Sequence, residues 1–375
     1  MQTIFNGISH LSGILERIHC GKLFLVVDSS YPFLNIKEYV DALPVAGRVL
    51  FSGFTPNPLY EQVCKGVELF RTTSCDAILA VGGGSAIDVA KCIKLAVLAK
   101  ESDKALIPPL VSQRLPIEGS RIPFIAIPTT AGTGSESTHN AVMYYEGVKQ
   151  TVTNDGVLPD YAVLEPSVLK TLPLYQKKCT MMDALCQGIE SWWSVNSTEE
   201  SRTYSRQAVE LIMANWQKYI FENDDRAAAQ VMLAANYGGR AIHIAQTTAA
   251  HAMSYKVSSL YGLPHGHAVA ICLPRIWDYM VAHMDRVVDV RGELYLRRTF
   301  SEIASALGVD VDHVEAAIRR FSEMLSALGL FCPVSENKEH DLDLLTHAVN
   351  PVRLKNNPVK LSQSAIKCLY DSIIH

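Results

Sequence analysis

A chain of 375 residues is longer than a single hydrophobic core usually serves, so the length predicts two domains. Its net charge of −4, with Lys and Arg scattered along the sequence, argues against a basic nucleic-acid surface. Hydrophobic residues make up 48% and charged residues 19% of the chain, a balance typical of a compact folded protein.

The cysteines and the apolar runs argue against a disulfide-stabilised, a secreted or a membrane-spanning protein. Nine cysteines, an odd number without a Cys-x-x-Cys pair, argue against a disulfide framework and against a cysteine-built zinc site, and they favour a reducing compartment. The first residues lack a signal-peptide pattern, and no apolar run approaches the ~20 residues that span a bilayer. We therefore expect a soluble, cytoplasmic protein without a nucleic-acid or membrane partner.

The first 160 residues alternate short apolar runs with segments of helical periodicity. Strands are expected at residues 22–28, 47–51, 76–81 and 121–128, and helices at residues 57–72 and 85–100. A small, polar stretch, residues 129–137, follows the last of these strands. Strands that alternate with helices predict a parallel sheet covered on both faces.

From about Pro166 the pattern changes to long segments rich in Ala, Leu, Met and Glu. Helices are expected at residues 180–193, 201–221, 225–245 and 312–328, and strand-like runs are scarce. Strands grouped first and helices grouped afterwards predict two domains. We assign residues 1–160 to an α/β N-terminal domain and residues 161–375 to an all-α C-terminal domain.

A glycine cluster, Gly82-Gly83-Gly84-Ser85, follows a buried strand and precedes a helix. Glycines at such a turn let backbone N–H groups approach a phosphate, and the helix adds its positive N-terminal end. A turn that starts a helix without binding anything is the alternative. Asp88 and Lys91 follow on the first turns of the helix.

Two further features favour a ligand at this cluster. The loop from Thr129 to Glu136 follows a later strand, and the carboxyl ends of parallel strands form the crevice where such sheets bind ligands. Asp28 ends the first long strand and suits an acid that accepts hydrogen bonds from a ribose. Because a carboxylate would repel a 2′-phosphate, NAD(H) is favoured over NADP(H). An ordinary turn residue is the alternative role for Asp28.

Potential metal ligands lie in the second domain. Asp183 and Gln187 stand one turn apart on an apolar helix without Lys or Arg, so the carboxylate is expected to be buried and to need a partner. His251 and His265 flank a Gly-Leu-Pro turn, and imidazole is a common ligand of transition metals. Histidines satisfied within the core are the alternative. An oxygen-and-nitrogen set suits Fe(II), Zn(II) or a similar divalent ion.

Four motifs occur in the order found in iron-containing (group III) alcohol dehydrogenases, and the sequence resembles that family over nearly its whole length. They are Gly-Gly-Gly-Ser-x-x-Asp-x-x-Lys from Gly82, Pro-Thr-Thr-x-Gly-Thr-Gly-Ser-Glu from Pro128, Asp-Ala-Leu from Asp183, and His…Pro-His-Gly from His251 to Gly266. The resemblance implies a dehydroquinate synthase-like fold. This fold has a Rossmann-like dinucleotide-binding domain, an all-helical domain, and a metal in the cleft between them.

The resemblance also implies roles for individual residues. Asp183, Gln187, His251 and His265 fall on the four metal-ligand positions. The residues at cofactor positions are Asp28, Gly82, Gly83, Gly84, Ser85, Asp88, Thr129, Thr130 and Thr133. A homodimer is expected.

Two positions depart from the family's pattern. Many members have histidine where this chain has Gln187, and many have histidine at the position of Tyr255. An amide oxygen is a neutral and weaker ligand than imidazole for such ions. We therefore expect lower metal affinity or a different metal.

The implied reaction is metal-assisted hydride transfer between the dinucleotide and a small aldehyde or alcohol. His267 and Tyr255 are the candidate catalytic proton donors, with solvent as the alternative. The residues around Gln187 and His265 are similar to the phosphonoacetaldehyde reductase branch, which implies reduction of phosphonoacetaldehyde to 2-hydroxyethylphosphonate. Cationic candidates for the phosphonate are Lys149, Arg240 and Lys256.

Three other functions stay open at this point. A generic short-chain alcohol dehydrogenase of the same family would share every motif. A cyclase or lyase of the dehydroquinate synthase kind would share the fold, although the Asp-Ala-Leu helix argues against it. A catalytically inactive relative is conceivable because of Gln187 and Tyr255.

Overall fold

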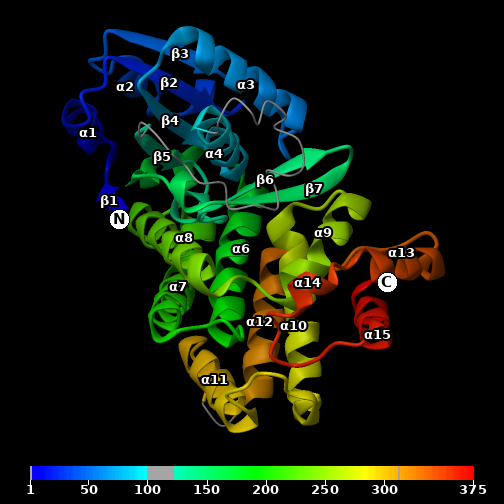
Figure 1. The fold of residues 1–375 in the computed structure, drawn as a ribbon. Helices are drawn as coiled ribbons and strands as arrows, with labels where there is room; N and C mark the ends of the chain where they lie inside the picture. Colours follow the sequence, from blue (N-terminus) through cyan, green and yellow to red (C-terminus); the bar gives the residue numbers. More distant parts are fainter. Residues whose placement is uncertain (1, 99–121, 311–312) are drawn as a thin grey trace. The chain divides into compact units, whose positions relative to one another are not determined.

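The computed structural model describes residues 2–98, 122–310 and 313–375. The chain forms two compact units, Met1–Leu172 and Pro173–His375 (Figure 1). Within the described residues, all named strands belong to the first unit and the second unit is helical. The expected fold class, an α/β domain followed by an all-α domain, is confirmed.

A six-stranded parallel sheet forms the centre of the first unit. Its spatial order is β1-β8-β5-β4-β2-β3. The central strands β2, β4 and β5 are almost wholly buried, as continuous apolar runs in a sheet covered on both faces should be. The six strands are β1 (Thr3–Asn6), β2 (Lys22–Val27), β3 (Gly47–Phe51), β4 (Ala77–Gly82), β5 (Phe124–Pro128) and β8 (Tyr161–Leu164).

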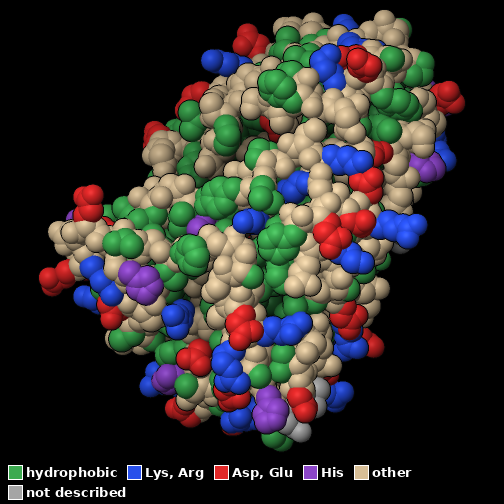
Figure 2. All heavy atoms as spheres, turned by 180° about the vertical axis from the view of Figure 1, so that it is seen from behind, with side chains coloured by type: hydrophobic (Ala, Val, Ile, Leu, Met, Phe, Trp, Pro, Cys, Tyr) green, Lys and Arg blue, Asp and Glu red, His purple; other side chains and the backbone are tan. Residues whose placement is uncertain are grey.

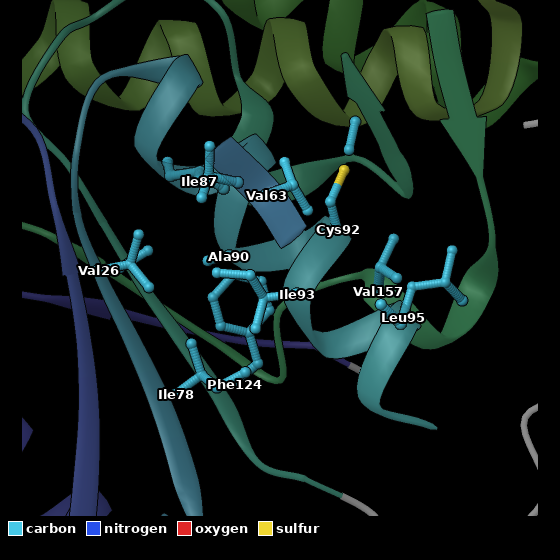
Figure 3. Packing of buried hydrophobic residues seen from close by; sticks show 14 of the residues in the cluster. Val26, Val63, Ile78, Ile87, Ala90, Cys92, Ile93, Leu95, Phe124 and Val157 are labelled. Carbon is cyan, nitrogen blue, oxygen red and sulfur yellow. The ribbon is translucent and has the colours of Figure 1, made fainter. Parts of the chain in front are cut away.

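Helices α3 and α4 supply much of the core beside this sheet. Figure 3 shows Ile78 and Phe124 from the strands packed with Ile87, Ala90 and Ile93 of α4. The α-helices of this unit are α1 (Leu11–Arg17), α2 (Lys37–Asp41), α3 (Tyr60–Thr73) and α4 (Gly84–Leu98). The 3₁₀ turns are η1 (Ile8–His10), η2 (Tyr31–Phe33), η4 (Ser135–Ser137), η5 (Asp155–Val157) and η6 (Pro166–Thr171).

The expected elements of this unit occur with shifted ends. Helix α3 begins at Tyr60, because Asn57 has a positive φ of 57° and Leu59 is extended as the N-cap. Lys100 and Arg121, the ends of an expected helix and an expected strand, lie outside the described residues. The antiparallel hairpin of β6 (Asn140–Tyr145) and β7 (Val148–Thr153) was not expected.

Two charged residues of α4, one of them fully buried, tie this helix to the segment after β5. Lys91 Nζ is fully buried and donates hydrogen bonds to Ser135 Oγ (2.9 Å) and Asn140 O (2.7 Å). Asp88 accepts hydrogen bonds from Ser135 Oγ (2.6 Å) and from Val142 N (3.0 Å). Burial lowers the pKa of Lys91 to about 8, although the charge of Asp88 opposes this shift.

Replacing Lys91 by Met should remove a pH-dependent part of the free energy of unfolding. Below pH 8 the ammonium is charged in the folded and the unfolded chain, and its burial then destabilises the fold. Between pH 8 and 10.5 the folded chain has released this proton while the unfolded chain keeps it, so stability rises with pH, by up to about 3 kcal/mol. The urea midpoint of K91M, relative to that of the unmodified protein, should therefore fall from about pH 8 to about pH 10. A constant difference over this range would contradict the lowered pKa.

The second unit consists of helices packed around the long, buried helix α6. Its α-helices are α6 (Leu174–Trp193), α7 (Glu199–Gln217), α8 (Asp225–Ala245), α9 (Ala249–Tyr261), α10 (His265–Ala282), α11 (Glu293–Ala306), α12 (Val314–Leu328), α13 (Lys338–Ala348), α14 (Pro351–Leu354) and α15 (Gln363–Ile373). The π-helical turn η7 (Lys218–Glu222) continues α7, and the 3₁₀ turn η8 (Met284–Arg286) follows α10. The expected helix over residues 225–245 is confirmed with the same ends. The expected start of α12 at Asp312 lies outside the described residues.

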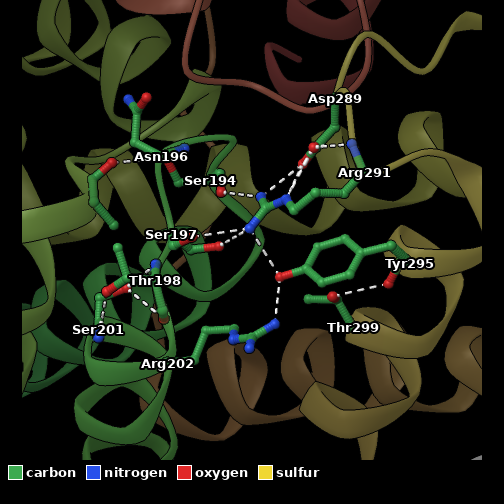
Figure 4. Close-up of polar contacts among 11 residues, drawn as sticks. Ser194, Asn196, Ser197, Thr198, Ser201, Arg202, Asp289, Arg291, Tyr295 and Thr299 are labelled. Atoms are coloured by element: carbon green, nitrogen blue, oxygen red, sulfur yellow. Dashed lines mark hydrogen bonds and ion pairs between the residues drawn. The ribbon is translucent and has the colours of Figure 1, made fainter.

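An arginine network fixes the C-terminal end of α6. Figure 4 shows the guanidinium of Arg291 directed at Asp289, at the Tyr295 hydroxyl, and at the segment that follows α6. Arg291 donates to Ser194 O (2.8 Å) and to Ser197 O (2.9 Å), and it pairs with the buried carboxylate of Asp289 (2.6 Å). Because these contacts satisfy backbone carbonyls at the helix end, they hold α6 at a defined position.

The surface charges are mixed and the cysteines are unpaired, as the composition predicts. On the face drawn in Figure 2, basic and acidic side chains are interspersed over the surface. All nine cysteines are free thiols. No helix among the described residues is long and apolar enough to cross a membrane.

Candidate functional site

The glycine turn lies between β4 and α4 and requires residues without side chains. A Cβ on Gly82 would lie 2.5 Å from Asp28 Oδ2 and 2.6 Å from Ala86 Cβ. A Cβ on Gly84 would lie 2.9 Å from Thr133 Cγ2. A Cβ essentially never lies this close to an atom to which it is not bonded, so the glycines allow the strand end, Asp28 and the Thr133 loop to meet.

Asp28 holds this turn. Its Oδ2 accepts a hydrogen bond from the backbone N of Gly83 (2.8 Å), and its Oδ1 accepts one from the backbone N of Ser30 (2.9 Å). The carboxylate is half-buried. Its Oδ1 also accepts a hydrogen bond from Ser30 Oγ (2.5 Å). Asp28 therefore has a structural role at the glycine turn, and its Oδ2 keeps a lone pair that a ribose hydroxyl could use.

The second small-residue loop lies beside the glycine turn. Strands β4 and β5 are parallel neighbours, with Gly82 opposite Pro128, and Thr129 N donates to Gly82 O (3.0 Å). A Cβ on Gly83 would lie 3.6 Å from Thr130 Cγ2, an ordinary contact distance. The structure thus brings the expected cofactor residues of both loops together at the carboxyl ends of the strands. Asp88 instead faces Ser135 and Val142, within the first unit.

Three candidate metal ligands converge in the second unit. Asp183 of α6, His251 of α9 and His265 of α10 place one ligand atom each within 4.8 Å of one another. Asp183 Oδ1 lies 3.3 Å from His251 Nε2 and 3.8 Å from His265 Nε2. Asp183 and His251 are buried, whereas the His265 side chain is 38% exposed. The group therefore has a buried side, at Asp183 and His251, and a side exposed to solvent, at His265.

Gly266, the residue after His265, explains how His265 reaches Asp183. A Cβ on Gly266 would lie 2.0 Å from the backbone oxygen of Cys179 and 2.9 Å from Asp183 Cβ. Only glycine lets the start of α10 approach α6 this closely. Gly262 ends α9 with φ 65°, and Pro264 is the N-cap of α10. The Gly-Leu-Pro-His-Gly run is thus a positioning device for His265.

Glu190 is a functional residue that the sequence reasoning missed. It is fully buried on α6, and its carboxylate accepts hydrogen bonds from Thr248 Oγ1 (2.5 Å) and Ala250 N (2.8 Å) at the start of α9. The same carboxylate binds His251 Nδ1. Glu190 therefore stabilises the N-terminus of α9 and directs the other ring nitrogen of His251 toward Asp183. The available signal was its spacing, seven residues after Asp183 and hence on the same face of an apolar helix.

The ring nitrogens of His251 are strongly polarised by this setting. Burial lowers the pKa of His251, but the charge of Glu190 and the hydrogen bonds that the Asp183 and Glu190 carboxylates accept outweigh it and raise the pKa to about 9. His251 Nε2 is buried, and Asp183 Oδ1 lies 3.3 Å away. A buried imidazole nitrogen beside a buried carboxylate and a second imidazole fits a divalent ion with N and O ligands.

Gln187, the fourth expected ligand, lies one turn after Asp183 and is buried. A Cβ on Gly238 of α8 would lie 3.2 Å from Gln187 Oε1, so this glycine leaves room for the amide. Gln187 shares a helix face with Asp183 and Glu190, both of which serve the site. The side chain is thus on the correct face of α6 for a ligand, and its coordination stays a prediction.

The two candidate proton donors have different surroundings. His267 is buried, with Nε2 donating to Phe331 O (2.9 Å) and Nδ1 2.8 Å from the Tyr175 hydroxyl. Burial lowers the pKa of His267, which favours the neutral ring. Tyr255 stacks on His265, with ring centroids 5.6 Å apart and planes at 8°. Tyr255 is therefore in contact with a candidate ligand, whereas both nitrogens of His267 have protein partners.

Comparison with known proteins agrees with this geometry. Residues 3–166 match the family model for iron-containing alcohol dehydrogenase, and residues 178–374 match that for the C-terminal part of the same family. The phosphonoacetaldehyde reductase of Streptomyces viridochromogenes is 33% identical over 304 residues, which cover 79% of this chain and 75% of the relative. The probable alcohol dehydrogenase EutG of Escherichia coli is 30% identical over 325 residues, with 84% and 76% covered.

A solved structure shares the fold over nearly the whole chain. Sulfoacetaldehyde reductase from Bifidobacterium kashiwanohense, in complex with NAD⁺, has a TM-score of 0.86 and 25% sequence identity, and the match covers 99% of this chain and 96% of that one. The two family models together account for most of the sequence. The chain therefore belongs to the iron-containing alcohol dehydrogenase family, whose members are oxidoreductases that act on CH–OH groups.

Proposed function

We propose that this protein reduces a small aldehyde to the alcohol with NADH and a divalent metal ion. The convergence of Asp183, His251 and His265, with ligand atoms within 4.8 Å of one another, is the observation that carries the proposal. Asp28 beside the glycine turn favours NADH over NADPH, because its carboxylate would repel a 2′-phosphate. The NAD⁺ bound to the sulfoacetaldehyde reductase supports the same cofactor.

The chain's own residues divide the work of the reaction. A divalent ion held by Asp183, His251 and His265 would supply Lewis-acid polarisation of the carbonyl, and NADH would supply the hydride. The glycine turn and the loop at Thr129 and Thr130 would bind the dinucleotide phosphates through backbone N–H groups. Tyr255, stacked on His265, would give the proton to the nascent alkoxide oxygen.

The substrate we propose is phosphonoacetaldehyde, which would be reduced to 2-hydroxyethylphosphonate. The 33% identity to a phosphonoacetaldehyde reductase supports it, as does the fold shared with a sulfoacetaldehyde reductase. Both substrates are two-carbon aldehydes that carry an anionic group. A site for them needs a cation near the metal ligands.

A test of the function compares aldehydes and cofactors on protein reconstituted with Fe(II) or Zn(II). We expect a higher kcat/KM for phosphonoacetaldehyde than for acetaldehyde or butyraldehyde, with NADH preferred to NADPH. A higher kcat/KM for the neutral aldehydes would contradict phosphonoacetaldehyde as the substrate and would instead indicate a general alcohol dehydrogenase. Cofactor binding without turnover of any aldehyde would indicate an inactive relative. Full activity after removal of the metal by a chelator would contradict the role of the ion.

Gln187→His should raise the affinity for the metal. Imidazole is a stronger ligand than an amide for Fe(II) and Zn(II), and Gly238 leaves space beside the side chain. We expect the dissociation constant for Zn(II), measured by chelator competition, to fall by roughly 10-fold or more. Gln217→His, at an exposed position at the end of α7, is a control for a histidine added elsewhere. If Q187H binds Zn(II) no more tightly than the unmodified protein, Gln187 is not part of the ligand set.

A further inference from the structure

The start of α10 lies along one face of α6, and the two helices meet there in a row of contacts. Tyr175, Cys179 and Asp183 follow one another at intervals of four residues on α6, which places them on the same face. Their partners are three successive residues of α10, in reverse order: His267, Gly266 and His265. The candidate ligand pair of Asp183 and His265 is therefore one end of this row.

His267 makes the contact at the other end of the row. Its Nδ1 lies 2.8 Å from the Tyr175 hydroxyl, and its Nε2 lies 2.9 Å from Phe331 O. Because a carbonyl oxygen can only accept, Nε2 carries a proton, and in the neutral ring Nδ1 then accepts from the Tyr175 hydroxyl. The Tyr175 ring stands edge-on to the imidazole, with planes at 90° and centroids 5.9 Å apart. One side chain thus fixes the start of α10 both to α6 and to the segment that follows α12.

The first turn of α10 depends on this side chain for its position. Within the described part of the chain, the N-cap residue Pro264 makes no side-chain capping hydrogen bond. The His267 side chain is buried, whereas the His265 side chain, two residues earlier, is 38% exposed. The position of a partly exposed side chain at a helix end follows the backbone of the turn that carries it. The two hydrogen bonds of His267 fix that turn.

We propose that His267 is a positioning residue, which holds the first turn of α10 so that His265 faces Asp183. Both nitrogens of the His267 ring are bound by protein partners, Tyr175 and Phe331, so the ring is built to connect helices. This inference rests on the metal site of the proposed function. It gives His267 a role that acts through His265, in place of the proton transfer that its residue type suggested.

His267→Phe, measured in the full-length protein, keeps a ring in the buried position and removes both hydrogen bonds. We expect the dissociation constant for Co(II) to rise roughly 10-fold, the smaller end of the effect of losing groups that orient metal ligands. The Co(II) absorption bands at saturating metal should shift, because they report the geometry of the ligands. Tyr175→Phe removes one of the two hydrogen bonds and should show a smaller change. His267→Gln, whose amide can still donate to Phe331 O, should recover part of the affinity.

The matched control is His283→Phe, at the other end of α10. This imidazole also contacts a backbone oxygen, with Nδ1 2.8 Å from Tyr279 O. H283F should keep the Co(II) affinity and the absorption bands of the unmodified protein. Loss of a proton donor would lower turnover and leave both metal measurements unchanged, so unchanged affinity and bands in H267F would contradict the inference.

Hydrogen–deuterium exchange of the metal-free protein gives a second measurement. The amides of residues 268–271, whose hydrogen bonds close the first turn of α10, should exchange faster in H267F, while those of residues 276–282 exchange as before. Faster exchange along the whole helix would contradict the inference, since it indicates only general support of α10. If the unmodified protein binds no Co(II), the proposed metal function fails, and exchange at residues 268–271 alone then decides whether His267 fixes the start of this helix.

Discussion

Asp183→Asn should remove the bound metal and lower kcat/KM for aldehyde reduction by roughly 1,000-fold, because Lewis-acid polarisation contributes several kcal/mol to transition-state stabilisation. Asp183 supplies the carboxylate of the convergent group, and its Oδ1 lies 3.3 Å from His251 Nε2 and 3.8 Å from His265 Nε2. An amide has nearly the same shape but no charge, so the two imidazoles would lose the anion that balances a divalent cation. Metal content measured by elemental analysis should fall with the activity.

The control for this variant must separate loss of metal from loss of the fold. Asp285→Asn changes an exposed carboxylate of the same unit and should keep both metal and activity. Circular dichroism should show the same helix content for D183N as for the unmodified protein, since the amide keeps the packing of α6 against Gly266. Full metal content in D183N would contradict the ligand role of Asp183. Full activity without metal would contradict the role of the ion in the reaction.

The fold class followed from patterns that are local in the sequence. Buried strands such as β2 and β4 are continuous apolar runs, and α8 has clear helical periodicity with Asp224 as its N-cap. The edge strand β1 and the hairpin β6–β7 were harder to predict. Strand β1 has only four residues, and β6 and β7 alternate polar and apolar residues with no fully buried run. Strand β1 pairs with β8, far away in the sequence, whereas β6 and β7 pair with each other and their strand character depends on packing rather than on an apolar run.

The sequence predicted those parts of the candidate site whose residue type itself indicates the chemistry, such as metal-binding carboxylates and imidazoles. Asp183, His251 and His265 were chosen as ligands by residue type, by helix spacing and by the family resemblance, and the structure places them together. Glu190 was not predicted because its role depends on a contact between two helices. The Glu190 carboxylate contacts His251, which lies 61 residues later in the sequence.

Gly266 illustrates the same limit. The sequence shows a glycine after His265, which is also what an ordinary helix start would show. Only the distance of 2.0 Å from its missing Cβ to the oxygen of Cys179 reveals that α10 touches α6 there. Helix approach is a property of the packed unit and not of a local pattern, so the sequence alone could not assign this glycine to the site.

Glu190→Gln should weaken metal binding by about 10- to 100-fold, the usual effect of losing the partner that orients a ligand histidine. The carboxylate binds His251 Nδ1 and so directs Nε2 toward Asp183. The amide of glutamine fills the same space and can still accept from Ala250 N, but it no longer attracts the proton on Nδ1 with a full charge. The imidazole then becomes a weaker ligand, and chelator competition for Zn(II) should show the loss.

Thr248→Val distinguishes this orienting role from the support that Glu190 gives to α9. The Thr248 hydroxyl donates to Glu190 (2.5 Å) and accepts from Trp193 Nε1 (2.9 Å), so its removal should destabilise the start of α9 while the carboxylate keeps its contact with His251. We expect a lower urea midpoint with Zn(II) affinity kept in T248V, and reduced Zn(II) affinity in E190Q. If the two variants lose stability alike and both bind Zn(II) as the unmodified protein does, Glu190 supports only the helix. A loss of Zn(II) affinity confined to E190Q would show that Glu190 belongs to the metal site. Its charge, on the same helix as Asp183, would then be what orients His251 as a ligand.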